Sequence, residues 1–158
     1  MFPIIPANSV AAETGNDEGI FGFGNSGSDV SMTNLVSNAG VVATDTTGVG
    51  TARNYLAACE FGGDQGIFGF GFLAGNSATA VTNLVSNAGV VATDVTGVGT
   101  ARKSLAACEY GYDKGIFGYG YASSNVSMTN LVSNAGVVAT DTTGVGTARN
   151  FLAACSFN

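Results

Sequence analysis

Short runs of large apolar residues alternating with glycine or polar residues recur along the chain, and they predict β-strands. Residues 20–24 (Ile-Phe-Gly-Phe-Gly) follow this alternation, so we expect a strand with Phe21 and Phe23 on one face. Three more short strands are predicted after it, at residues 34–37, 41–44 and 55–59. No segment of the sequence has the spacing of apolar residues that is typical of a helix.

This strand pattern occurs three times. Residues 33–53, 82–102 and 129–149 differ at one of 21 positions, where Thr46 and Thr142 are matched by Val95. A Gly-Ile-Phe-Gly block and a Leu-Ala-Ala-Cys block recur with the same period of 47 or 49 residues. Three units of this length are typical of a repeat architecture such as a propeller.

We therefore predict an all-β protein with three four-stranded repeats. The repeat domain covers residues 17–158 and follows an N-terminal arm at residues 1–16. The repeats lie at about 17–63, 64–112 and 113–158.

Taken from its arginine onward, the unit resembles a kelch repeat. The order is Arg-x-x-Leu-Ala-Ala, then Ile-Phe-Gly-Phe-Gly, Thr-Asn-Leu-Val-Ser-Asn and Val-Val-Ala-Thr-Asp. The unit departs from the kelch pattern because it has no outer-strand tryptophan and has Gly-Phe-Gly in place of Gly-Gly. The repeats, and the opening Phe2-Pro3-Ile4-Ile5-Pro6-Ala7-Asn8-Ser9, resemble kelch-like proteins of tailed marine bacteriophages. The resemblance implies a β-propeller in a virion, as a fibre, decoration or host-contact protein without catalytic residues.

Three units are too few for a closed ring, because propellers typically have four to eight blades. The chain begins with the Ile-Phe-Gly strand and ends with the Leu-Ala-Ala-Cys strand, which are neighbours in a kelch-like blade. We therefore expect a homodimer that forms a six-bladed ring, with residues 151–157 of each chain pairing with residues 19–24 of the other. The alternative is a β-trefoil, a monomer whose terminal strands pair in cis.

Composition narrows the classes of function. The chain has 158 residues, of which 46% are hydrophobic and 10% charged, as expected of a folded domain. Its net charge of −6 provides no basic stripe for nucleic acid. The sequence has no histidine, the commonest general base and zinc ligand, so we expect no enzymatic activity, metal or cofactor.

The sequence also carries an expectation about location. Its opening residues lack the basic region of a secretory signal, and no stretch has the length of an apolar membrane helix. We expect a protein that is made in the host cytoplasm and assembled into a virion without membrane insertion.

Charged residues recur at equivalent positions of the repeats. The three equivalent arginines are Arg53, Arg102 and Arg149, and the aspartates eight residues before them are Asp45, Asp94 and Asp141. They could line a ligand site, or form ion pairs and bonds to loop carbonyls within each blade. Their recurrence favours the structural role, because a buried guanidinium needs partners wherever the unit recurs.

The segments after the first strand of each repeat are the most divergent, and the middle one is two residues longer. Such loops often carry binding specificity. The candidate ligand-binding residues are Asn25, Ser26, Asp29, Phe72, Asn76, Ser77, Tyr121, Ser124 and Asn125. Their polar groups suit a hydroxyl-rich ligand such as a host-surface glycan, on which the two aromatic rings could stack. The other interpretation is that these loops only solvate the rim.

Two functions follow from these patterns. The first is a structural or host-contact component of a virion, in which the N-terminal arm docks onto other virion proteins. The second is a free-standing carbohydrate-binding lectin of β-trefoil or β-propeller form.

Overall fold

The structure, a computed structural model, describes residues 18–157. The described residues form ten strands and no helix, which confirms the predicted all-β class. The predicted N-terminal arm lies outside the described residues. The strands are β1 (Gly19–Asn25), β2 (Asp29–Val36), β3 (Ala57–Phe61), β4 (Gln65–Gly69), β5 (Phe72–Leu73), β6 (Ser77–Ala78), β7 (Thr82–Val85), β8 (Ala106–Tyr110), β9 (Lys114–Gly118) and β10 (Thr129–Val132).

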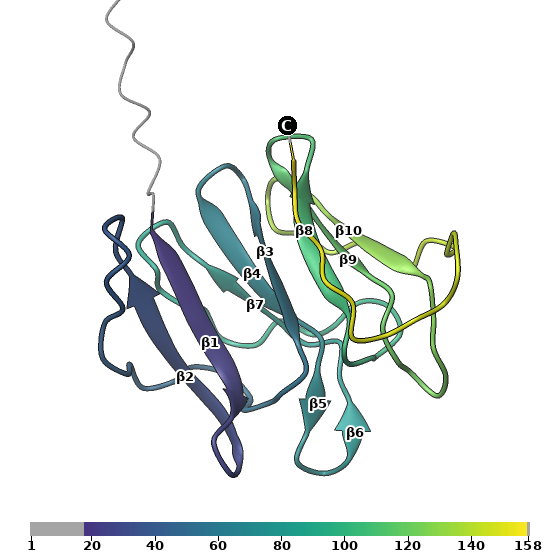
Figure 1. Cartoon of the computed structure of the whole chain (residues 1–158), viewed down its shortest axis with the longest axis horizontal. Coiled ribbons are helices and arrows are strands. Elements are labelled where there is room, and N and C mark those ends of the chain that lie inside the picture. The colour runs from purple at the N-terminus through teal and green to yellow at the C-terminus, as the bar shows by residue number, and fades with distance from the viewer. Residues whose placement is uncertain (1–17, 158) are drawn as a thin grey trace, which may run out of the picture.

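The strands form small antiparallel sheets that we group into three units. The first unit is the β1–β2 hairpin, the middle unit has the order β3-β4-β7, and the third unit has the order β8-β9-β10. The short β5–β6 hairpin extends from the middle unit, where the sequence has its two extra residues. The units stand side by side like an open fan, with the β5–β6 hairpin at the bottom of the view (Figure 1).

The predicted third strand of each repeat is only partly formed. Segments 42–46, 91–95 and 138–142 lie beside β2, β7 and β10, but they contact them through two isolated bridges each and not through a continuous ladder. Each unit therefore has at most three ladder strands in the described residues. The prediction of four full strands per repeat is wrong in this respect.

Large apolar side chains fill the spaces between the units. One cluster joins the first and middle units and contains Phe23, Phe68, Val85 and Val91. The other joins the middle and third units and contains Phe61, Ile67, Phe70, Leu105, Phe117 and Val132. Because each unit is a thin sheet, its buried face depends on the next unit, as expected of a repeat protein.

The prediction that Phe21 and Phe23 share a face of β1 is wrong. The pairing of β1 with β2 shifts between Gly22 and Gly24, and Phe23 has a positive φ of 62°. This bulge breaks the alternation, so Phe23 is buried whereas Phe21 is 64% exposed. Phe70 and Tyr119, at the equivalent positions, also have a φ of 62°, so this backbone conformation recurs in every unit.

The two ends of the described chain lie at open edges. Among residues 18–157, no strand lies beside the edge of β1 that faces away from β2, and segment 151–157 forms no ladder. This segment runs alongside β8, as the yellow trace in Figure 1 shows, and the Phe151 amide donates to the Ser104 carbonyl. Within residues 18–157, no bridge joins this segment to β1.

Candidate functional site

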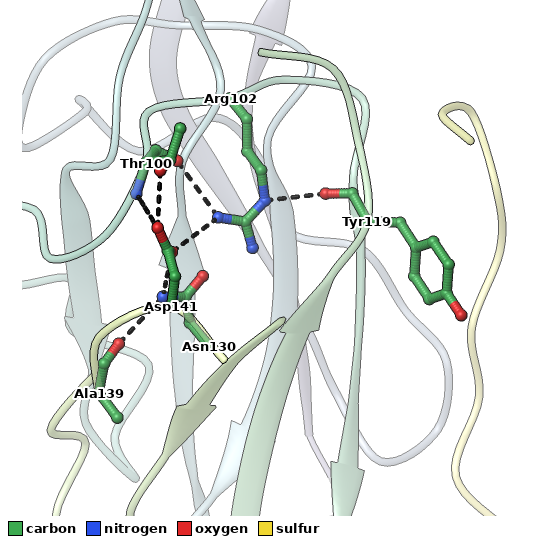
Figure 2. A network of polar contacts seen from close by, with 6 residues as sticks. All are labelled: Thr100, Arg102, Tyr119, Asn130, Ala139 and Asp141. Atoms are coloured by element: carbon green, nitrogen blue, oxygen red, sulfur yellow. Dashed lines mark hydrogen bonds and ion pairs between the residues drawn. The ribbon is translucent and has the colours of Figure 1, made fainter. Parts of the chain in front are cut away.

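Arg102 is fully buried where the middle and third units meet (Figure 2). Its Nε donates to the Tyr119 carbonyl at 2.8 Å, and its Nη1 donates to the Thr100 carbonyl at 3.2 Å. The same Nη1 lies 3.9 Å from Asp141 Oδ1. A guanidinium with several N–H donors in a fixed plane is suited to hold loop carbonyls and a carboxylate at once.

Asp141 receives its own set of donors. The Thr100 hydroxyl donates to Oδ2 at 2.6 Å, and the Thr100 amide also donates to the carboxylate. Asn130 donates from Nδ2 to Asp141 Oδ1 at 2.9 Å and to the Ala139 carbonyl at 3.0 Å. The carboxylate is therefore held between two segments of the chain, one that contains Thr100 and one that contains Asn130.

The middle unit contains a similar arrangement, but here the arginine and the asparagine bond to each other, whereas Arg102 Nη2 and Asn130 Oδ1 have no hydrogen-bond partner within residues 18–157. Arg53 is fully buried, with Nε donating to the Phe70 carbonyl at 2.9 Å and Nη2 donating to Asn83 Oδ1 at 2.7 Å. Thr51 and Asn83 donate to Asp94 at 2.5 and 2.9 Å. We call each set of arginine, threonine, asparagine and aspartate an arginine joint.

The arginines do not pair with the aspartates that precede them by eight residues. Arg53 lies near Asp94 of the following sequence repeat, and Asp45 instead accepts a hydrogen bond from Asn34 at 2.8 Å. The reason is that the arginine precedes the first strand of the next sheet unit, so its partners come from that unit. No further sheet unit follows Arg149 within residues 18–157, and among these residues its side chain makes one hydrogen bond, to the Thr147 carbonyl.

Each arginine also contacts the unit before it. Arg53, Arg102 and Arg149 lie 4.2 Å from the centroids of the Phe23, Phe70 and Tyr119 rings, respectively. A guanidinium at this distance is attracted by the face of the ring. The joint therefore connects neighbouring units as well as the loops within one unit.

The joints shift the pKa values of their members. Burial lowers the pKa of Arg53 and of Arg102 to about 10, although Asp94 and Asp141 respectively act in the opposite direction. Both guanidinium groups therefore remain charged at neutral pH. Burial also disfavours the two charged carboxylates, but hydrogen bonds from threonine and asparagine and the nearby arginine outweigh it, so both pKa values are lowered.

We expect acid to destabilise the protein through these two aspartates. Because the pKa of Asp94 and of Asp141 is lowered on folding, the stabilisation is complete above the ordinary value of 3.8 and is lost as the pH falls below it. Urea denaturation at pH 7 and pH 3 will measure this loss. The double variant Asp94→Asn/Asp141→Asn should be less stable at pH 7 and lose less on acidification. An equal loss in both proteins would contradict this prediction.

The candidate ligand-binding residues lie in three separate loops at one end of the fan. Asn25, Ser26 and Asp29 are at the tip of the β1–β2 hairpin, where Asn25 Nδ2 donates to Asp29 Oδ1 at 3.1 Å. Phe72, Asn76 and Ser77 belong to the β5–β6 hairpin. Tyr121, Ser124 and Asn125 form the corresponding turn of the third unit, in which Tyr121 bridges Asn125.

Two of these loops meet at a lysine that sequence reasoning missed. Lys103 Nζ lies 3.6 Å from the centroid of the Phe72 ring, and the rings of Tyr55 and Tyr121 are 5.9 and 6.0 Å away. Tyr55 also packs edge-on against Phe151, at 6.0 Å between centroids. We call these five side chains the aromatic cluster.

The sequence contains a signal for the aromatic cluster. The two positions after the repeated arginine read Asn54-Tyr55, Lys103-Ser104 and Asn150-Phe151, whereas the 21 positions ending at that arginine are nearly constant. Variable positions beside constant ones indicate a surface whose chemistry differs between units. In the cluster, one positive charge lies near one exposed ring, Tyr55, and two half-buried rings, Phe72 and Tyr121.

Cysteine thiols and carboxylates are the other groups that could carry chemistry. Burial raises the pKa of the Cys59 thiol to about 12, so this thiol is protonated at neutral pH and a poor nucleophile. Residues 18–157 contain no group of three or more acidic, cysteine or histidine side chains placed to hold a metal ion. Within the same residues, no helix is long and apolar enough to span a membrane.

Comparisons with known proteins do not assign this chain to a family. No protein-family model matches it, and no curated protein matches it.

Proposed function

We propose that this protein is a non-enzymatic structural component of a tailed-bacteriophage virion, acting as a fibre, decoration or host-contact protein. The observation that carries the proposal is the repeated arginine joint. In both complete joints, the arginine and the aspartate are bonded to backbone carbonyls, threonine or asparagine, and Arg102 also forms an ion pair with Asp141. Groups used in this way hold neighbouring units together.

The order of strands supports a kelch-like propeller. In the middle and third units, the arginine is followed by a small-residue strand, the Ile-Phe-Gly strand and the Thr-Asn-Leu-Val strand, paired in that order. A fan of such sheets is the arrangement expected of propeller blades. In a β-trefoil the terminal strands would pair within one chain, and the described residues contain no such pair.

The proposal predicts that the chain is part of the particle. An antibody raised against the recombinant protein should label purified virions of the phage that encodes it in immunogold electron microscopy. Antibody adsorbed beforehand with the recombinant protein is the control. A chain lacking residues 2–8 should be absent from particles if the arm docks onto other virion proteins. Detection only in the soluble fraction of infected cells would contradict the proposal.

The aromatic cluster favours a second candidate function, carbohydrate binding. Exposed aromatic rings beside polar loops are suited to stack on sugar rings and to bond their hydroxyl groups. Tyr55 is 51% exposed and Phe151 is 73% exposed, so both rings are accessible. Glycan-array binding by the isolated protein, competed by a simple sugar and lost in Tyr55→Ala, would favour a lectin, either free-standing or as the host-contact surface of a virion.

A further inference from the structure

We infer that residues 152–157 of a second copy of this chain occupy the groove between β1 and β3, so that two copies close a ring through two identical junctions. The inference deepens the proposed function and rests on it, because it names the partner of the scaffold. Four features support it. Each is a contact that forms between neighbouring units of the chain but lacks one partner at β1 and at the segment around residues 147–157.

The first feature is the register of the inner strands. Ala58 of β3 lies opposite Phe68, and Ala107 of β8 lies opposite Phe117. By the repeat, Ala154 should lie opposite Phe21. The first unit has β1 but no strand on this edge, and segment 152–157 has the sequence of such a strand but no strand to pair with.

The second feature is a groove at the expected place. A hollow of about 260 Å³ lies between the two units, lined on one side by Gly19 and Ile20 of β1 and on the other by Ala58, Cys59 and Glu60 of β3. In the middle and third units, the corresponding space beside β4 and β9 is filled by β3 and β8. The occupant that fits this groove is therefore a strand of the Leu-Ala-Ala-Cys type.

The third feature is an aromatic ring of the first unit that lacks the glycine contact made by its equivalents in the other units. The rings of Phe68 and Phe117 cover glycines of the preceding unit, since a Cβ on Gly22 would lie 2.9 Å from Phe68 Cζ and one on Gly69 would lie 2.6 Å from Phe117 Cζ.

Phe21 is the equivalent ring of the first unit, and it covers no glycine. It is 64% exposed, whereas Phe68 and Phe117 are 5% and 0% exposed. At the other end of the fan, a Cβ on Gly118 would meet only Thr129. We therefore expect the Phe21 ring of one copy to pack on Gly118 of the other.

The fourth feature is a divided arginine joint. The first unit holds the acceptor half, in which Asn34 donates to Asp45 at 2.8 Å as Asn83 and Asn130 do in the complete joints. The end of the chain holds the donor half, Thr147 and Arg149, with Arg149 already over its ring. In a complete joint, the threonine and arginine contact the asparagine and aspartate of the next unit. Thr147 and Arg149 of one copy could contact Asn34 and Asp45 of the other in the same way.

The number of copies follows from the number of units. Each copy offers one donor end and one acceptor end, so the contact is head-to-tail and must close into a ring or continue as a filament. Two copies of the three described units give six units, the only multiple of three within the usual range of four to eight blades.

The first test is the mass in solution. Light scattering after size-exclusion chromatography, under reducing conditions, should give twice the chain mass of 15.7 kDa for the wild type. Phe21→Glu should give a single chain mass, because a charge cannot be buried against Gly118. Val137→Glu is the matched control, since Val137 is 66% exposed and follows Gly136, which packs on Leu84 and Phe61 of the middle unit and not on the proposed groove, and it should keep the doubled mass. A wild-type mass other than twice the chain mass would overturn the inference.

The second test fixes the register. Cys59 and Cys108 lie opposite Ile67 and Ile116, so native Cys155 should lie opposite Ile20 of the other copy. Cross-strand neighbours are close enough for a disulfide. Ile20→Cys should therefore give a covalent dimer on a non-reducing gel after mild oxidation, and Ile20→Cys/Cys155→Ser should not. Equal amounts of dimer in both variants would refute this register.

The two proposals fail separately. A monomeric protein that is nevertheless labelled on virions would refute the ring and leave the proposed function intact. A dimer with the expected cross-link that is absent from virions would refute the proposed function and leave the ring intact.

Discussion

Replacing Arg102 by methionine is expected to lower the free energy of unfolding by about 2–4 kcal/mol. Methionine keeps much of the aliphatic stem, so the variant mainly removes the guanidinium. The loss includes the charge-assisted bonds to the Tyr119 and Thr100 carbonyls and the contact with the Phe70 ring. Urea denaturation at pH 7 will measure it.

The expected loss is smaller than the summed free energies of these contacts, because burying the charged guanidinium has a cost of its own. Burial lowers the pKa of Arg102 to about 10, which means that the folded state disfavours the charge relative to water. Removing the guanidinium removes that cost as well. The carbonyl of Tyr119, however, loses the donor that it has in the native protein, and an unsatisfied buried acceptor is costly.

A lysine on the surface provides the control. Lys114 forms an ion pair with Asp113 at 2.6 Å in which both side chains are exposed. Such pairs contribute little to stability, so Lys114→Met should leave the denaturation midpoint unchanged. If Arg102→Met were as stable as Lys114→Met, the arginine joint would not hold the units together.

The strands that sequence patterns predict best are those whose side chains alternate locally. The Ile-Phe-Gly strand and the Thr-Asn-Leu-Val strand form in all three units at about the expected residues. The third strand of each repeat, such as residues 41–44, forms only isolated bridges. β-propensity depends on neighbours, and this outer segment has a partner on one side only.

The bulge at Phe23 was not predictable from alternation. A positive φ at a phenylalanine is unfavourable on its own, and it is maintained because the ring is then buried between units, 5.2 Å from Phe68 and beneath Arg53. This environment comes from residues 30 to 45 positions away in the sequence. A local pattern carries no information about it.

The three arginines also show that a local sequence pattern does not determine the environment of a side chain. Arg53, Arg102 and Arg149 each end the same repeated 21-residue stretch, yet the first two are fully buried and Arg149 is exposed. The difference arises because no further unit packs over Arg149 within residues 18–157. The recurring charges are visible in the sequence, but their partners depend on the order of units in space.

Replacing Gly50 by alanine is expected to cost about 3–5 kcal/mol of unfolding free energy, because it adds a collision to backbone strain. Gly50 has a φ of 87°, a conformation that favours glycine. A Cβ there would lie 2.5 Å from Asp94 Oδ1 and 2.6 Å from Asn83 Nδ2. These atoms cannot move away without breaking the bonds that Asp94 accepts from Asn83 and Thr51.

Gly63 separates the two contributions. Its φ of 82° is close to that of Gly50, but a Cβ there would have no atom within 4 Å. Gly63→Ala should therefore cost only the backbone strain, about 1–2 kcal/mol. The difference between the two alanine variants, measured by urea denaturation, is the contribution of the joint at Asp94. Equal losses would mean that the loop at Gly50 relaxes freely, and that the geometry of the arginine joint does not limit stability.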